Sequence, residues 1–239
     1  MNLVLDTGNT STKAALFENA MPVKKERLLS SDAQAISGFI KGFSIEKAII
    51  SSVIRDPSTI LKFLESSVQK VHLLTWRSHF PFEIDYKTPD TLGTDRLAAA
   101  AGALVRHPGS DIMVIDAGSA LTVDLVTGGE YRGGSISPGL SMRFRALHEY
   151  TGRLPLLTPS GEFSFPGRTT EDAIAGGVLM GIAFEINEYI RTFGKRHKKL
   201  ITVITGGDGK MIASHTGISI LHYPDLVAEG LNYLLDTNV

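Results

Sequence analysis

The feature that most constrains the fold of this chain is a motif that occurs near the N-terminus and again near the middle. Corresponding residues of the two copies are separated by the same number of positions. In each copy an aliphatic, β-branched run ends in Asp, passes a small residue and a Gly, and resumes as a second apolar run. This pattern predicts a strand, a tight turn and a second strand. The coinciding residues are Val4 with Val114, Asp6 with Asp116, Gly8 with Gly118 and Thr12 with Thr122.

The chemistry of this turn suits a phosphate group. A Gly lets a ligand approach the backbone, and a turn of small residues presents several N–H groups to an anion. A carboxylate beside a phosphate would be repelled, so the Asp implies a bound cation between them. One such turn also occurs in hairpins that bind nothing. Two copies in two halves of a chain resemble the way in which the actin, sugar-kinase and Hsp70 superfamily holds ATP.

The order of predicted elements agrees with that superfamily. The first half reads β-β-β-α-β-α-β and the second half repeats the plan, which favours mixed sheets covered by helices. We therefore expect an α/β fold of two actin-like (ribonuclease H-like) domains, comprising residues 1–108 and 109–239. A final amphipathic helix over 225–235 is expected to close the second domain.

Composition narrows the possible partners. The chain has 239 residues, of which 43% are hydrophobic and 21% charged, as in globular proteins. It has no cysteine, which excludes disulfides, and a formal charge of −1, which argues against broad nucleic-acid binding. No long apolar run is apparent and the N-terminus begins without a secretory leader, so we expect no membrane segment and a cytoplasmic location. A small molecule is the expected partner.

Two turns are candidates for nucleotide contacts. Lys13 could reach a β- or γ-phosphate, although a lysine at a strand end is also often only solvated. Gly206 and Gly207 follow a buried strand and would let a flat group such as adenine lie against the backbone, although a strand-to-helix turn reads the same way.

His72, among leucines in a predicted strand, is interpreted as structural.

A third motif could bind the phosphate acceptor. Residues 93–96 read Gly-Thr-Asp-Arg before a helix rich in alanine, and Tyr86 lies in the irregular segment ahead of them. In one interpretation, Thr94 or Asp95 merely caps the helix. In the other, Asp95 is a base beside an anion-binding guanidinium, that of Arg96.

Taken in order, these motifs resemble the type III pantothenate kinases along essentially the full chain. Asp6-Thr-Gly-Asn-Thr resembles their first phosphate motif and Gly93-Thr-Asp-Arg96 their substrate motif. Asp116-Ala-Gly-Ser resembles the second phosphate motif and Gly206-Gly the adenosine motif. The resemblance implies phosphorylation of pantothenate by ATP, the first step of coenzyme A synthesis.

The resemblance also implies roles for individual residues. Asp95 would accept the hydroxyl proton, and Asp116 would bind a monovalent cation, K⁺ or NH₄⁺. Asp6 would hold Mg²⁺ with ATP. The implied pantothenate contacts are Tyr86, Gly93, Thr94, Asp95, Arg96 and Thr170, and the implied ATP contacts are Asp6, Thr7, Gly8, Asn9, Thr10, Ser11, Thr12, Lys13, Ser119, Gly206 and Gly207.

Family members are usually dimers, so a homodimer is also implied. The chain departs from the family pattern at Ser119, where Thr is usual, and at Thr169, where Asn is common. Another small-molecule kinase of the superfamily, or a non-catalytic regulator on the same fold, are the alternatives. Only Tyr86, the motif at 93–96 and Thr170 distinguish pantothenate from other acceptors.

Overall fold

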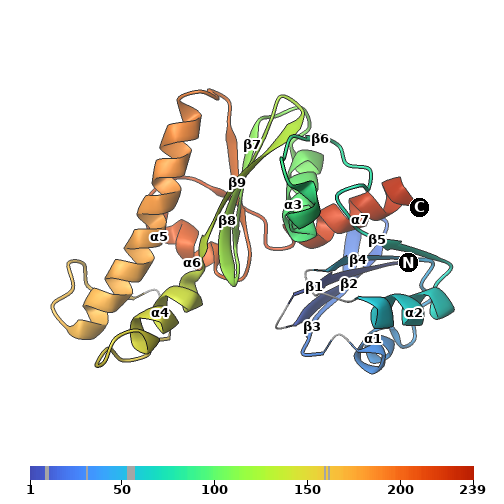
Figure 1. The fold of residues 1–239 in the computed structure, drawn as a ribbon, viewed down its shortest axis with the longest axis horizontal. Coiled ribbons are helices and arrows are strands. Elements are labelled where there is room, and N and C mark those ends of the chain that lie inside the picture. The colour runs from blue at the N-terminus through green and yellow to red at the C-terminus, as the bar shows by residue number, and fades with distance from the viewer. Residues whose placement is uncertain (9–10, 31, 53–56, 159, 161) are drawn as a thin grey trace. The chain divides into compact units, whose positions relative to one another are not determined.

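The structure is a computed structural model that describes residues 1–8, 11–30, 32–52, 57–158, 160 and 162–239 (Figure 1). The chain divides into two compact units, Met1–Pro108 with Leu226–Val239, and Gly109–Asp225. Each unit contains a mixed sheet flanked by helices, as the sequence predicts.

The first unit is built on a sheet with the strand order β3-β2-β1-β4-β5. β1, β2 and β3 are antiparallel neighbours, whereas β4 and β5 run parallel to β1. The chain order β-β-β-α-β-α-β is as expected. The elements are β1 (Asn2–Thr7), β2 (Thr12–Glu18), β3 (Met21–Leu28), α1 (Ala33–Ile40), β4 (Lys47–Ser52), α2 (Ser58–Ser67), β5 (Lys70–Leu73), β6 (Glu83–Ile84), the 3₁₀ helix η1 (Pro89–Thr91), α3 (Thr94–Arg106) and α7 (Leu226–Asn238).

Strand alternation divides the first sheet into two faces. Leu3 and Leu5 belong to the core that contains buried residues of α1 and α2. The intervening residues of β1 point the opposite way, toward α7, where the amide of Asn2 donates to Asn232 at 2.9 Å. Figure 1 shows α1 and α2 on one side of this sheet and α7 on the other. Asp6, in step with Asn2, therefore lies on the face away from the α1 and α2 core.

The last helix, α7, belongs to the first unit, whereas the sequence analysis assigned it to the second domain. The reason is a close helix pair between α3 and α7. A Cβ on Gly102 would lie 2.4 Å from the carbonyl oxygen of Leu226, and one on Gly230 would lie 1.9 Å from that of Ala98. The alanine-rich α3 thus admits a neighbouring backbone. Arg106 and Glu229 add an ion pair at the C-terminal end of α3.

The second unit repeats the order β-β-β-α-β-α-β, except that two helices, α4 and α5, stand where the first unit has α1 alone. Its strands follow the order β11-β10-β7-β8-β9, with β7, β10 and β11 parallel and β8 antiparallel to both β7 and β9. The elements are β7 (Ile112–Ala117), β8 (Ala120–Thr127), β9 (Glu130–Pro138), α4 (Leu140–Glu149), α5 (Thr170–Gly194), β10 (Ile201–Thr205), α6 (Gly209–Thr216) and β11 (Leu221–His222).

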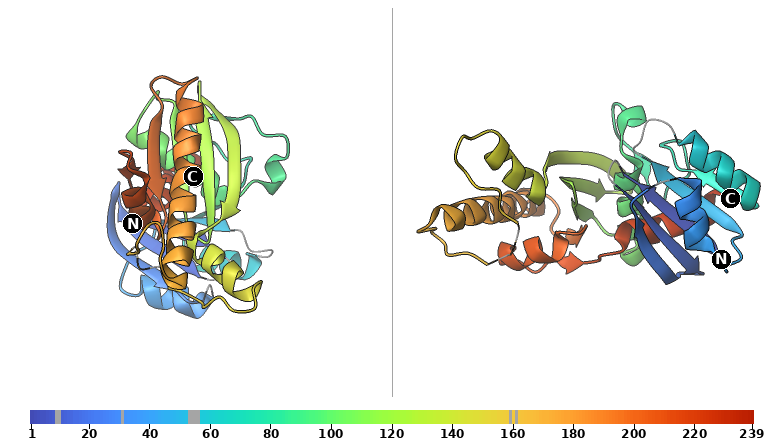
Figure 2. Two further views of the ribbon diagram at one scale, coloured as in Figure 1. Left: turned by 90° about the vertical axis from the view of Figure 1, so that its left-hand side faces the viewer. Right: turned by 90° about the horizontal axis from the view of Figure 1, so that it is seen from below.

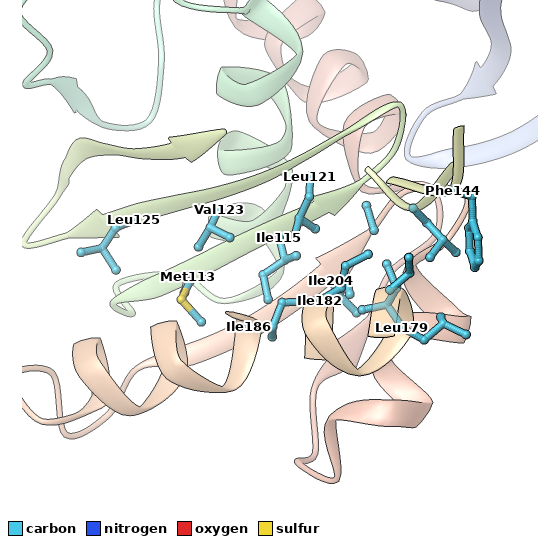
Figure 3. Close-up of a cluster of buried hydrophobic side chains, with 14 of the residues drawn as sticks. Met113, Ile115, Leu121, Val123, Leu125, Phe144, Leu179, Ile182, Ile186 and Ile204 are labelled. Carbon is cyan, nitrogen blue, oxygen red and sulfur yellow. The ribbon is translucent and has the colours of Figure 1, made fainter. Parts of the chain in front are cut away.

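One hydrophobic cluster fills the space between this sheet and its helices (Figure 3). Met113 and Ile115 of β7 point into it together with Ile182 and Ile186 of α5. Ile112, Val114 and Asp116 alternate with these strand residues, so they lie on the opposite face of the sheet. Asp116 therefore occupies in its sheet a position like that of Asp6 in the first.

The long helix α5 runs along the face of the second sheet (Figure 2, left). By length and hydropathy it could span a membrane, which differs from the expectation that no run of this kind exists. Its buried residues, Ile174, Val178, Leu179, Ile182, Ala183 and Ile186 among them, face the sheet core. Packing within the unit thus accounts for the apolar residues on one face of α5, whereas its outward face also contains apolar residues such as Phe184.

Helix starts show where local signals were sufficient. Asp32 is the N-cap of α1 and accepts the Ala35 N–H at 2.8 Å. At α2 the N-cap is Pro57, and Asp56, which as an Asp before a proline would be a candidate cap by sequence, lies outside the described residues. At α3 the N-cap is Gly93, so neither residue proposed as a cap, Thr94 or Asp95, occupies that position.

Candidate functional site

The two predicted turns share one construction, but differ in length. In the first, the Gly8 N–H donates to the Ser11 carbonyl at 3.1 Å. In the second, the Gly118 N–H donates to the Ala120 carbonyl at 3.0 Å. Because the first turn is one residue longer, Asp6 pairs with Lys13 whereas Asp116 pairs with Thr122.

The coincidence of Thr12 with Thr122 in sequence therefore does not hold in three dimensions. Thr12 pairs with Thr7 across the first hairpin, and its hydroxyl donates to that of Thr7 at 3.3 Å with both residues buried. Lys13, rather than Thr12, therefore lies opposite the Asp6 carboxylate. The extra residue in the first turn thus gives only that turn a lysine opposite its Asp.

The fold itself does not require glycine at either turn. A Cβ on Gly8 or Gly118 would meet its nearest neighbour at 3.5 Å, an ordinary contact, and neither residue has a left-handed backbone. What glycine changes there is the outer surface of the turn, where a missing side chain leaves the backbone open to a ligand. This observation agrees with turns adapted to an approaching phosphate.

A row of polar side chains crosses the first sheet at the level of Asp6. The register pairs Arg27 with Lys13, Lys13 with Asp6, and Asp6 with Ser51. Residues paired directly across neighbouring strands lie on one face of a sheet. Lys13 Nζ is 3.8 Å from Asp6 Oδ2, and Arg27 Nε donates to Ser11 Oγ at 2.7 Å. Two cations thus lie beside the first turn.

Arg27 and Ser51 were missed by the sequence analysis. The available signal for Ser51 was a pair of serines ending an otherwise apolar strand, at the same edge as Asp6. Arg27 gave no local signal, because charged residues alternate along the exposed strand β3. Its place in the row follows only from the strand register.

The row continues from the sheet onto α3. Ser51 Oγ lies 2.9 Å from Thr94 Oγ1, the hydroxyl of the first residue of the helix. Asp95 follows, and its Oδ1 accepts the N–H of Arg96 at 2.9 Å. The same oxygen would lie 2.4 Å from a Cβ on Gly93, so glycine at 93 makes room for this carboxylate. The structure thus links the first turn and the 93–96 motif within one unit.

The remaining predicted acceptor residues occupy different places. Arg96 is largely buried, at 7% exposure, and Tyr86 is half-buried between β6 and η1. Thr170 is the exposed first residue of α5 in the second unit. Thr169, where the family commonly has Asn, is the N-cap and accepts the Asp172 N–H at 3.0 Å. Since Thr and Asn both cap helices, this departure preserves the start of α5.

The second turn is enclosed by glycines that the fold does require. Gly206 has φ +89°, and a Cβ there would lie 2.5 Å from Asp116 Oδ1. A Cβ on Gly139, the N-cap of α4, would lie 2.3 Å from the Gly118 carbonyl oxygen. The backbone of the Gly206 turn and the N-terminus of α4 therefore both approach the second turn closely. Ser119, at that turn, is exposed.

The predicted adenosine turn joins β10 to α6. Gly207 is exposed, and a Cβ there would meet nothing within 4 Å, so one face of this turn is open. The Asp208 N–H donates to the Ala117 carbonyl at 3.0 Å, which fixes the turn to the end of β7. Burial raises the pKa of the Asp208 carboxyl. Asn9 and Thr10 of the first turn lie outside the described residues.

The residues present fit a nucleotide-bound metal rather than a metal cage. Among the described residues, no three or more His, Asp or Glu side chains gather as metal ligands. Mg²⁺ in nucleotide sites typically takes one or two carboxylates and completes its shell with phosphates and water. The single carboxylate of Asp6 suits that arrangement. At Asp116, a carboxylate beside the bare Gly206 backbone offers a cradle that a Cβ would fill.

Comparisons with solved structures define the class. A glucokinase from an Antarctic psychrotroph has a TM-score of 0.53 at 12% identity, covering 98% of each chain. A Campylobacter jejuni protein named as a Baf family transcriptional activator has a TM-score of 0.67 at 24% identity, covering 99% of this chain and 98% of that one. At these identities the likeness concerns the fold, which is that of the actin-like sugar kinases.

Sequence comparisons then give the family. The model of the family described as type III pantothenate kinase matches residues 2–192. A type III pantothenate kinase from Christiangramia forsetii is 38% identical over 244 residues, covering 100% of this chain and 99% of that protein. The chain belongs to the type III pantothenate kinase family.

Proposed function

We propose that this protein phosphorylates pantothenate with ATP to give 4′-phosphopantothenate, the first step of coenzyme A biosynthesis. One observation carries the proposal beyond family membership. The carboxylate at the first phosphate turn, Asp6, and the candidate base, Asp95, lie in one unit and are joined through Ser51 and Thr94. A nucleotide site and an acceptor site on one rigid frame are what phosphoryl transfer needs.

The nucleotide is proposed to bind through both turns. In the first unit, the open backbone at Gly8 and the ammonium of Lys13 would receive phosphate oxygens, with residues 6–13 forming the contact. In the second unit, Ser119 would bind phosphate through its hydroxyl, which replaces the hydroxyl of the usual Thr. Gly206 and Gly207 would receive the adenosine, supported by the open face at Gly207.

The acceptor is proposed to bind at the start of α3. The Arg96 guanidinium would hold the carboxylate of pantothenate, with Tyr86, Gly93, Thr94 and Thr170 completing the contact. Asp95 would accept the proton of the primary hydroxyl of pantothenate while the hydroxyl oxygen forms a bond to the γ-phosphorus of ATP. The bond from that phosphorus to the bridging oxygen breaks and ADP leaves. A positioned base contributes about 10²–10⁴-fold to such a step.

Two cations are proposed to accompany the nucleotide. Mg²⁺ would be held by Asp6 together with ATP, and would neutralise charge on the phosphates. K⁺ or NH₄⁺ would be held by Asp116, where it would offset the repulsion between the carboxylate and a phosphate. Lys13, whose Nζ lies 3.8 Å from Asp6 Oδ2, would help Mg²⁺ to neutralise the charge on the phosphates.

A homodimer in the cytoplasm is proposed, without a nucleic-acid or membrane partner. Support for the dimer comes from the outward face of α5. Gly176 packs closely, because a Cβ there would lie 3.1 Å from Phe165 and 3.2 Å from Phe163, whereas a Cβ on Gly177 or Gly181 would meet nothing within 4 Å. Phe184 on the same helix is 55% exposed. An apolar surface with small residues suits a second copy of the chain.

The decisive experiment is an ATP-consumption assay over a panel of acceptors, run with Mg²⁺ and with or without K⁺. We expect ADP release that depends on pantothenate, with little release on sugars, and a rate that falls when K⁺ is replaced by a bulky organic cation. ADP release on another acceptor alone would establish a different small-molecule kinase. No release on any acceptor would indicate a non-catalytic member of the fold. Light scattering on the eluted protein tests the dimer.

A further inference from the structure

We propose that Ser51 is a positioning residue, which fixes the start of α3 and therefore the place of Asp95 relative to Asp6. This inference rests on the proposed function, and it adds a residue that belongs to none of the phosphate, acceptor or adenosine motifs. Ser51 is fully buried and its Oγ lies 2.9 Å from Thr94 Oγ1. It pairs with Asp6 on the adjacent parallel strand.

The first turn of α3 is packed through Arg96 and Leu97, which are buried, but its cap adds no side-chain hydrogen bond. Gly93 is the N-cap and has no side chain with which to accept an N–H of the first turn. The Asp95 carboxylate bonds to the backbone N–H of its own neighbour, Arg96, which orients the carboxylate on the helix but does not tie the helix to the sheet. The Ser51–Thr94 hydrogen bond does connect the helix start to the strand beside Asp6.

The other end of α3 is fixed independently. Gly102 packs against the backbone of α7, and Arg106 pairs with Glu229. Gly230 of α7 packs against Ala98, which extends this packing to the second turn of α3, so the bond to Ser51 acts on the first turn, residues 94–97. Loss of the Ser51 hydroxyl would therefore move Asp95 and Arg96 without removing either of them. A misplacement of about 1 Å at a reacting group can lower a rate about 10²-fold.

The second unit has a hydroxyl at the matching position. Thr205 of β10 pairs with Asp116 of β7 as Ser51 pairs with Asp6, and it is also buried. Its Oγ1 donates to the Pro224 carbonyl at 3.5 Å, just before the chain leaves the unit. In both units, the buried hydroxyl paired with the Asp is thus hydrogen-bonded to a segment outside the sheet. That segment is the start of α3 in the first unit and the stretch at Pro224 in the second.

The test is a set of variants that remove or retain the hydroxyl pair. Ser51→Ala and Thr94→Val each delete one partner, Ser51→Ala/Thr94→Val deletes both, and Thr94→Ser keeps the hydroxyl. Thr216→Val is the control, since it deletes a buried hydroxyl of α6 that bonds to the Ala213 carbonyl in the other unit. For each protein we measure kcat, the KM for pantothenate, the KM for ATP and the Tm.

We expect each single deletion to lower kcat/KM for pantothenate about tenfold or more, with the KM for ATP changed less than about twofold. The double variant should be no worse than the worse single variant, because both remove the same bond. Thr94→Ser keeps a hydroxyl that can bond to Ser51, so the amides in the first turn of α3 should exchange at the wild-type rate in this variant. Thr216→Val should lower the Tm and leave the kinetic constants unchanged.

Hydrogen exchange supplies a readout that needs no substrate. The amides in the first turn of α3 should exchange faster in Ser51→Ala than in wild type or in Thr216→Val. Wild-type kinetic constants and wild-type exchange in Ser51→Ala would overturn the proposal, as would single-variant effects that multiply in the double variant. A wild-type protein inactive on pantothenate would contradict the proposed function instead, and the exchange result would still decide the role of Ser51.

Discussion

The Nζ of Lys13 lies 3.8 Å from Oδ2 of Asp6, its direct partner across the first hairpin. The Lys13 side chain is 61% exposed whereas that of Asp6 is 16% exposed, so the lysine projects outward from a partly enclosed carboxylate. The second hairpin has Thr122 in the corresponding position. The two halves therefore differ in charge at the point where the proposed site needs a cation most, at the terminal phosphates.

Replacing Lys13 by Gln should impair nucleotide binding more than stability. Exposed ion pairs contribute about 0–1 kcal/mol to folding, so the Tm should hardly change. Loss of a charge-assisted contact to phosphate is worth about 1.5–3 kcal/mol, so the KM for ATP should rise about tenfold or more. Steady-state kinetics at varied ATP measures this, and Lys62→Gln on α2 is the control. An unchanged KM for ATP would assign Lys13 to the solvated surface.

Gly206→Ala should damage the second half of the site. The residue has φ +89°, and its Cβ would lie 2.4 Å from the Ala117 carbonyl oxygen. Gly217 has φ +67° with nothing near its Cβ, so Gly217→Ala measures the backbone strain alone, about 1–2 kcal/mol. We expect a larger fall in Tm for Gly206→Ala than for Gly217→Ala, together with a raised KM for ATP. Equal melting temperatures for the two variants would contradict the close approach.

Gly230→Ala should loosen the α3–α7 pair and thereby the first unit. A Cβ at this position would lie 1.9 Å from the Ala98 carbonyl oxygen, and overpacking of this kind typically costs about 1–3 kcal/mol. Gly38→Ala, in the open middle of α1, is the control and should stabilise by about 0.5–1 kcal/mol. Thermal unfolding of both variants decides the matter. A stable Gly230→Ala protein would show that α7 does not pack as described.

Asp95→Asn separates catalysis from structure. An asparagine keeps an oxygen that can accept the Arg96 N–H, so the first turn of α3 should persist and the Tm should change little. If Asp95 accepts the hydroxyl proton, kcat should fall about 10²-fold or more. Rapid-quench or coupled kinetics on pantothenate, beside a melting curve, gives both values. An Asp95→Asn protein with wild-type kcat would remove the base from the mechanism.

His72 should contribute a pH dependence to stability. Burial lowers the pKa of its imidazole in the folded protein, and its Nε2 lies 2.8 Å from Ser78 Oγ. A group whose folded pKa is lowered stabilises the fold above its unfolded pKa, near 6.5, and loses that contribution as the pH falls through the folded value. Between about pH 7 and pH 5, the free energy of unfolding should thus decline less in His72→Gln than in wild type. Parallel profiles would contradict this role.

The repeated units and the motifs can be read from local patterns in the sequence. The Asp-x-Gly turns and the alternation of strand residues are local signals, and they placed Asp6 and Asp116 at the ends of matching strands. The N-cap at Asp32 is also a local feature, because a cap depends on residues within one turn. The interpretation of His72 as structural agrees with its half-buried position and its contact with Ser78.

The contacts between residues far apart in sequence depend on how the elements pack in three dimensions. Arg27 and Ser51 join Asp6 through strand register, and a shift of one residue in a turn changes every pair across a hairpin. The assignment of α7 to the first unit depended on Gly102 and Gly230, whose fit is a property of two helix surfaces far apart in sequence. Local patterns fix what a segment becomes, whereas packing between segments fixes where its side chains lie, and the proposed site depends on both.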